Sequence, residues 1–250
     1  MNMHDYQAPP GLLKDRVILI TGASGAIGAA AARAYAAAGA SVILVGRTQG
    51  KLEKVYDEIV AAGHPTPAIA PLNLETAPPE DYQRLAGMIR QEFGRLDGLL
   101  HAAAWLGVLA PLEHYDIGVW SRVMQVNLNA PMLMTRACLG LLKESPDASV
   151  LFSSCEVGRQ GTAYWGAFGA GFAAVENLAQ QLSEELEANT AVRVNCVDPG
   201  PIRSRLRALA FPGEDPNQLP PAETVIPAYL YLMGPDSREV NGQRIGAGKG

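Results

Sequence analysis

RVILITGASGAIGAAAARAYAAAGASVILVGR, residues 16–47, has the pattern of a strand, a glycine-rich loop, a helix and a second strand. The apolar runs at 17–20 and 41–45 are short and rich in β-branched side chains, which is typical of strands buried on both faces. The alanine-rich stretch between them ends at Gly39 and predicts a helix that packs closely on the sheet. We therefore expect a βαβ unit, from which parallel sheets are built.

The loop between the first strand and the helix has the composition of a phosphate-binding turn. A helix that opens from such a loop presents unpaired N–H groups and the positive end of its dipole, and a pyrophosphate can bind there. A tight turn without a ligand is the alternative, but glycines placed inside a βαβ unit favour dinucleotide binding. The candidate residues are Thr21, Gly22, Ser24, Gly25, Ala26, Ile27 and Gly28.

Composition limits the classes of function. The 250 residues are 48% hydrophobic and carry a net charge of −5, which disfavours nucleic-acid and anionic-membrane partners. The three cysteines are far apart and odd in number, as expected for reduced thiols in the cytoplasm. The first 15 residues lack the apolar core of a signal peptide, and the most apolar window, 99–112, is shorter than the about 20 residues of a membrane span. We expect a cytoplasmic protein without a membrane segment or a metal site.

Strand and helix patterns alternate through the rest of the chain. We expect further strands at 68–74, 96–104, 149–153, 192–197 and 243–247, and helices at 51–62, 79–93, 117–144, 168–188 and 229–233. This order predicts an α/β fold, with a doubly wound parallel sheet of about seven strands and a ligand crevice at the carboxyl ends of the strands. We interpret 1–250 as one Rossmann-fold domain, with an extension at 1–15 and a polar, proline-rich lid at 203–221.

Arg47, which follows the second strand, indicates the type of dinucleotide. Proteins that bind NAD place an acid there for the ribose 2′-hydroxyl, whereas an arginine can pair with a 2′-phosphate. The sequence therefore favours NADP(H) over NAD(H), the alternative being a solvated surface arginine.

Motifs spread over nearly the whole chain point to one family. They are Thr21-Gly22 with Gly28, residues 123–127 (VMQVN), 150–176 (VLFSSCEVGRQGTAYWGAFGAGFAAVE), Pro199-Gly200, 210–214 (AFPGE) and 231–234 (YLMG). Together they resemble the short-chain dehydrogenase/reductase family, in particular its YciK-type bacterial branch. The resemblance implies an NAD(P)(H)-dependent oxidoreductase that acts on a small carbonyl or alcohol substrate. Ala26 stands where the family has a glycine, which implies weaker cofactor binding.

Four catalytic positions of the family can be carried over by resemblance. The family uses a tyrosine as proton donor or acceptor, a lysine that lowers the tyrosine pKa and holds the nicotinamide ribose, a serine that orients the substrate, and a helical asparagine. These positions correspond to Phe168, Phe172, Cys155 and Asn127, so that only Asn127 matches. Tyr164 is an alternative for the tyrosine, but this register also supplies no lysine. A nucleophilic role for Cys155 would need a base such as His101 or Glu156.

The resemblance also implies the remaining cofactor contacts. They are Asn73 and Leu74 beside the adenine, Ala102 in the segment after the fourth strand, and Pro199, Gly200, Ile202 and Ser204 after the sixth. Family members commonly form dimers or tetramers, and we expect the same here.

Two functional hypotheses follow from the mismatched positions. The first is an oxidoreductase with weak or no turnover, because a positioned general acid is worth about 10²–10⁴ in rate. The second is a non-catalytic Rossmann protein that binds a nucleotide or a partner. Natural loss and deliberate alteration of the catalytic residues would both produce this pattern.

Overall fold

Seven strands in the described residues, 3–248, form one parallel sheet in the computed structural model. Their order is β3-β2-β1-β4-β5-β6-β7, and every neighbouring pair is parallel. The strands are β1 (Val17–Thr21), β2 (Ser41–Gly46), β3 (Ala68–Pro71), β4 (Gly98–His101), β5 (Ala148–Ser153), β6 (Val192–Asp198) and β7 (Arg244–Gly246). The prediction of a doubly wound parallel sheet of about seven strands is confirmed.

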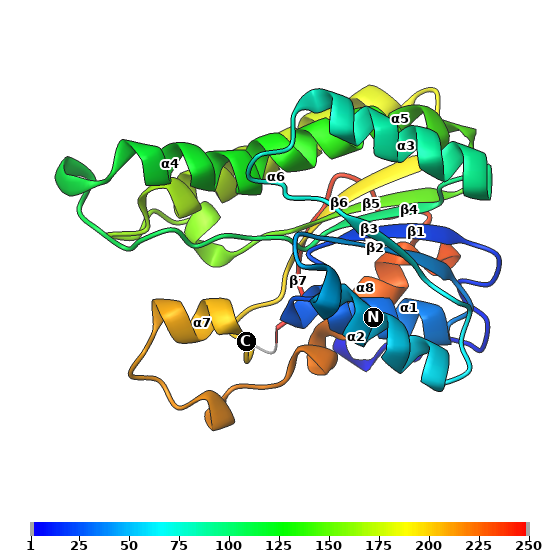
Figure 1. Cartoon of the computed structure of the whole chain (residues 1–250), viewed down its shortest axis with the longest axis horizontal. Helices are drawn as coiled ribbons and strands as arrows, with labels where there is room; N and C mark the ends of the chain where they lie inside the picture. The colour runs from blue at the N-terminus through cyan, green and yellow to red at the C-terminus, as the bar shows by residue number, and fades with distance from the viewer. Residues whose placement is uncertain (1–2, 249–250) are drawn as a thin grey trace.

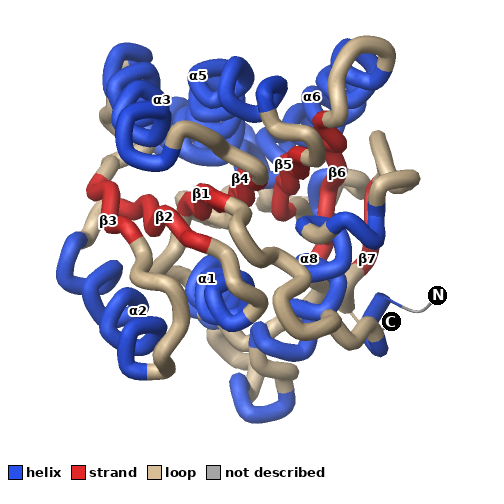
Figure 2. Tube along the Cα trace, turned by 90° about the vertical axis from the view of Figure 1, so that its right-hand side faces the viewer, coloured by secondary structure: helices blue, strands red, loops and turns tan. Residues whose placement is uncertain are grey.

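Helices cover both faces of this sheet (Figures 1 and 2). On one face lie α3 (Pro79–Phe93), α4 (Ile117–Met124), α5 (Ala130–Glu144) and α6 (Gly166–Glu187). On the other lie α1 (Ala26–Ala37), α2 (Gln49–Ala61) and α8 (Ile226–Met233), while α7 (Arg205–Ala210) stands apart, opposite α4. Short helical turns are η1 (Met3–Asp5), η2 (Leu112–His114), η3 (Gln125–Asn129), η4 (Glu156–Gly158), η5 (Pro216–Gln218), η6 (Ala222–Val225) and η7 (Pro235–Ser237).

The buried strands explain the three-layer arrangement. All five residues of β1 are buried, and their side chains alternate between two apolar clusters. Ile18 and Ile20 pack towards α1 and α8, whereas Val17 and Leu19 pack towards α3 and α5. A strand that is apolar on both faces requires helices on both faces, and the alternating order of elements supplies them.

Several predicted element boundaries need correction. The predicted helix at 117–144 consists of α4 and α5 joined by η3, a π-helical turn. The strands predicted at 68–74 and 96–104 are shorter, because the chain leaves the sheet after Pro71 and His101. Segment 203–221 contains the helix α7, which sequence periodicity missed because it has only six residues.

A buried carboxylate ties the amino ends of the strands together. Asp147, just before β5, pairs with Arg16, with Arg193 on β6 at 3.0 Å, and with Arg238 at 3.6 Å. Arg193 is buried and also donates hydrogen bonds to the carbonyl oxygens of Leu232 and Gly234, both at 3.1 Å. Burial by itself would raise the pKa of Asp147, but Arg16 and Arg193 lower it below its ordinary value.

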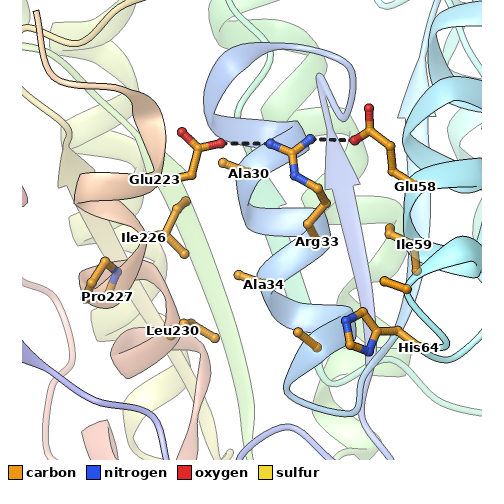
Figure 3. Close-up of a pocket in the computed structure, with 12 residues that line it drawn as sticks. Ala30, Arg33, Ala34, Glu58, Ile59, His64, Glu223, Ile226, Pro227 and Leu230 are labelled. Carbon is orange, nitrogen blue, oxygen red and sulfur yellow. Dashed lines mark hydrogen bonds and ion pairs between the residues drawn. The ribbon is translucent and has the colours of Figure 1, made fainter.

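A pocket of about 470 Å³ lies between α1, α2 and α8 (Figure 3). At its rim Arg33 on α1 bridges Glu58 on α2 and Glu223 on η6, at 2.9 Å each. These three side chains are exposed, so each pair contributes about 0–1 kcal/mol. The pairs therefore contribute little to the stability of the fold.

Replacing Asp147 tests the buried network. Asp147→Ala leaves the buried Arg193 without its counter-charge, and we expect a loss of about 3–5 kcal/mol in the free energy of unfolding. Because the folded-state pKa of Asp147 is lowered, its contribution is present above about pH 4 and is lost as the pH falls further. Urea unfolding at pH 7 and at pH 3.5 measures both effects. Asp81→Ala, which removes an ion pair to the exposed Arg84, is the matched control, and an equal loss in both variants would contradict the prediction.

Candidate active-site cleft

A cleft of about 1050 Å³ opens at the carboxyl ends of the strands. Its walls come from the segments after β1, β2, β4, β5 and β6, and α7 forms one side. The strand order reverses direction between β1 and β4, and a doubly wound sheet has its ligand crevice at this place.

Most of the predicted site residues line this cleft. They are Gly25, Ala26, Ile27, Arg47, Ala102, Cys155, Phe168, Phe172, Pro199, Gly200, Ile202 and Ser204. Thr21, Gly22, Ser24, Gly28, Asn73, Leu74 and Asn127 are not among its lining residues. Asn73 is exposed, and its Oδ1 accepts a hydrogen bond from the Glu75 N–H at 3.2 Å, so that it caps the turn after β3.

The glycine-rich loop is shaped by two close backbone approaches. Gly22 has φ +66°, and a Cβ there would lie 2.7 Å from the Ala103 backbone. A Cβ on Gly28 would collide with the Gly22 carbonyl oxygen. Gly25 is extended, with φ −82° and ψ 173°, and α1 begins at Ala26. The side chain of Ala26 is therefore compatible with this loop conformation. The N-terminus of α1 borders the cleft, and the backbone of Gly25 is exposed there.

Arg47 lies at the end of the cleft next to this loop. It follows β2, is exposed, and forms no ion pair with any residue between 3 and 248. Its guanidinium is therefore free to bind an anion that enters beside the loop.

Asn127 holds the segment after β4 in place. It is buried in the π-helical turn η3, where its Oδ1 accepts a hydrogen bond from the Trp105 N–H at 2.8 Å. Its Nδ2 donates to the Trp105 carbonyl oxygen at 3.0 Å. Both ends of the amide are thus engaged with one residue, which fixes the Trp105 backbone at the cleft wall.

Aromatic rings form the floor at the β5–α6 side of the cleft. Phe168 and Phe172 are one turn apart on α6, both are buried, and their ring centroids are 4.8 Å apart. Trp165 packs on Phe168 at 5.5 Å and on Phe211 at 5.9 Å. All four side chains line the cleft, so this region offers rings in place of a hydroxyl and an ammonium group.

A buried acid, which the sequence analysis missed, lies one turn further along α6. Glu176 accepts a hydrogen bond from the Ser154 hydroxyl, which itself lines the cleft. Arg244 approaches the other carboxylate oxygen at 3.3 Å, and Arg159 lies at 4.0 Å and pairs with Asp198. The signal was an acid eight residues after Phe168, which places it on the same apolar helix face. The Glu176 carboxylate is held between the Ser154 hydroxyl and two guanidinium groups, and we interpret Glu176 as a structural anchor.

Cys155 does not have the properties of a nucleophile. Burial raises the pKa of its thiol to about 12, so the thiol is protonated at neutral pH. His101, a base considered for it, hydrogen-bonds with Thr135 at 2.8 Å and stacks on Phe152. Glu156 has an exposed side chain that forms no hydrogen bond or ion pair within residues 3–248.

Tyr164 lies outside the cleft lining, with 59% of its surface exposed. Its φ is +75°, and its carbonyl oxygen accepts a hydrogen bond from the Ala110 N–H at 3.1 Å. Phe168, by contrast, is inside the cleft. The geometry therefore favours the register in which Phe168 occupies the tyrosine position.

The segment after β6 closes one side of the cleft. The Ser204 hydroxyl caps α7 by accepting a hydrogen bond from the Arg207 N–H at 3.1 Å. The Arg207 guanidinium pairs with Glu214 at 2.6 Å and lies 3.7 Å from the centre of the Phe211 ring. These contacts hold the aromatic ring of Phe211 against the cleft.

No group of three or more His, Cys, Asp and Glu side chains within residues 3–248 could hold a metal ion. Within the same residues, no helix combines the length and the apolar character that crossing a membrane requires.

The buried imidazole predicts a pH dependence of stability. Burial lowers the pKa of His101 to about 3, so His101 stays neutral in the folded protein while it is protonated in the unfolded chain below pH 6.5. Stability is therefore lost as the pH falls below 6.5, by about 2 kcal/mol between pH 7 and pH 5. Urea titrations of the wild type and His101→Gln should show this extra slope in the wild type alone. The exposed His114 provides the control His114→Gln, which should keep the slope, and a slope that persists in His101→Gln would contradict the assignment.

Comparisons with known proteins agree on one family. Residues 16–215 match the family described as short chain dehydrogenase. The Escherichia coli K12 protein called uncharacterized oxidoreductase YciK is 45% identical over 248 residues, which are 99% of this chain and 97% of the relative. A solved structure from Pseudomonas syringae, described as a short chain dehydrogenase, is 54% identical with a TM-score of 0.95 and covers 97% of this chain and 98% of its own. A Shigella flexneri 2a structure of the same description, in complex with NADP, is 44% identical with a TM-score of 0.93 and covers 96% and 99%.

Proposed function

This chain belongs to the short-chain dehydrogenase family, and on that basis we propose that it binds NADP(H) in the cleft and that its oxidoreductase turnover is weak or absent. The observation that carries the second part is the pair Phe168 and Phe172, whose rings line the cleft. The family resemblance implies that they correspond to the family's tyrosine and lysine. NADPH supplies a hydride when bound, and this chain's residues bind and orient it.

Three features support the proposed binding of NADP(H). Gly22 and Gly28 allow the close backbone contacts that shape the glycine-rich loop, because a Cβ at either position would collide with neighbouring backbone. Gly25 and Ala26, at the N-terminus of α1, line the cleft and are accessible to a pyrophosphate. Arg47 is unpaired at the same end of the cleft and suits a 2′-phosphate. The Shigella flexneri relative was solved with NADP. We propose further contacts from Ala102, Pro199, Ile202 and Ser204, which line the cleft, and from Asn73 and Leu74, which follow β3. Loss of the lysine contact to the ribose weakens the binding.

Arg47→Ala tests the preference for NADP(H). We expect NADPH to bind the wild type more tightly than NADH, because only NADPH has a 2′-phosphate. The variant should lose about 10- to 100-fold in NADPH affinity, the worth of a charge-assisted hydrogen bond. NADH affinity, which serves as the internal control, should stay the same. Fluorescence titration of both cofactors measures these values, and equal affinities in the wild type would overturn the preference.

The residues at the positions that correspond to the family's tyrosine and serine are poor proton donors. Phenylalanine has no exchangeable proton, and the Cys155 thiol is a weak hydrogen-bond donor that stays protonated at neutral pH. Asn127 is bound at both ends to Trp105, so its part is to position that segment. The remaining contribution of the chain is to bring a hydride donor and an acceptor close together.

Restoring the catalytic residues tests the turnover proposal. The wild type should reduce no simple ketone or aldehyde above background in the presence of NADPH, and Phe168→Tyr alone should recover little, because an untuned phenol has a pKa near 10. The combination of Phe168→Tyr, Phe172→Lys and Cys155→Ser should exceed the product of the single effects, since such groups act as a unit. Thermal unfolding of each variant separates loss of fold from loss of activity. Wild-type turnover on the order of 1–10³ s⁻¹ would overturn the proposal.

A second candidate function rests on the glycine-rich loop and Arg47. A non-catalytic protein that binds a nucleotide or a partner needs these two features but no proton donor, and the cleft has both of them at one end.

We also propose a cytoplasmic location and assembly into dimers or tetramers. The exposed apolar side chains of Ile117 on α4 and Met132 on α5 support assembly through these helices.

A further inference from the structure

Five aromatic side chains line the cleft. They form the aromatic wall, which consists of Trp105, Trp165, Phe168, Phe172 and Phe211. The rings of Trp165, Phe168, Phe172 and Phe211 form a continuous series with centroid separations of 4.8–5.9 Å and interplanar angles of 44–59°. Trp105 is held separately through Asn127, with Arg122 over its ring at 4.9 Å.

Several polar side chains next to this wall are already engaged within the protein. The Ser154 hydroxyl donates to Glu176, Arg159 pairs with Asp198, and Arg207 pairs with Glu214. A ligand at the aromatic wall therefore meets rings and few free hydrogen-bonding groups.

The unpaired charges next to the aromatic wall cancel. Glu156 and Arg205 line the cleft, and both side chains are exposed and without an ion pair among residues 3–248. One is negative and one is positive, so the cleft has no net preference for an anion or a cation here. This balance fits a neutral ligand.

We propose that the aromatic wall binds a neutral ligand with a flat, fused-ring aromatic system, beside NADP(H) in the same cleft. The proposal rests on the proposed function, because it assigns the glycine-loop end of the cleft to the cofactor. Tilted and offset rings are the geometry in which aromatic groups contact a further ring favourably, and such contacts act in addition to area burial. The cleft, at about 1050 Å³, is at the upper end of small-molecule sites and has room for two ligands along its length.

Calorimetric titration with three probes tests the ligand class. We expect 2-naphthol, which is neutral and flat, to bind the NADPH-saturated protein more tightly than the anion 2-naphthoate and the neutral chain n-decanol. Tighter binding of n-decanol would overturn the preference for rings, and tighter binding of 2-naphthoate would overturn the neutral class. Displacement of 2-naphthol by NADPH would overturn the side-by-side arrangement. NADPH affinity is measured in a separate titration, so NADPH binding without any 2-naphthol binding would reject this inference alone, and failure of NADPH to bind would reject the proposed function.

Variants at Phe211 distinguish ring contact from apolar area. Phe211 is 37% exposed, so the fold tolerates its replacement. Phe211→Leu keeps an apolar side chain and should weaken 2-naphthol binding about 3- to 10-fold, whereas Phe211→Tyr keeps the ring and should restore it. Met88→Ala on α3 removes an exposed apolar side chain outside the cleft and should change nothing. If Phe211→Leu and the wild type bind 2-naphthol with equal affinity, the aromatic wall does not contact the ligand and the proposal is wrong.

Discussion

The close approach of Gly22 to the backbone of Ala103 is the constraint on which the cleft depends. These residues follow β1 and β4, the two central strands, and a single methyl group at Gly22 would push the segments apart. This contact holds the glycine-rich loop close to the segment after β4, and α1 begins at the edge of the cleft. The carboxyl ends of β4, β5 and β6 then supply the other walls. A ligand site at this place thus follows from a contact that only glycine permits.

The sequence predicted the fold well because its strands are apolar on both faces. Residues 17–20 and 41–45 could only be central parallel strands, and the alternating helices then left one architecture open. The family resemblance is likewise confirmed, by the match over residues 16–215 and by the YciK relative. Boundaries were less predictable at 117–144, where hydrophobic periodicity does not distinguish a π-helical turn from an α-helix. The six-residue α7 was too short to produce a periodic signal.

Part of the candidate site was visible in the sequence because it depends on local pattern. Arg47 was found from its position after a strand, Phe168 and Phe172 were found from the family resemblance, and all three line the cleft. Contacts between distant segments were not visible. One example is the contact of Asn127 on η3 with Trp105, in the segment after β4. Another is the ion pair of Glu176 on α6 with Arg244 on the edge strand β7. Glu176 illustrates the difficulty: an acid within an apolar helix face signals burial, but its partners come from 17 to 68 residues away along the chain.

The two edges of the sheet bear on solubility. β3 has four residues and ends at Pro71, and β7 has three residues, of which Arg244 bonds back to α6. An edge strand exposes a row of unpaired backbone groups that another chain can extend, and short strands, proline and charge each limit that row. This sheet therefore offers little template for open-ended strand addition, and its long apolar strands lie in the interior of the sheet, away from that hazard.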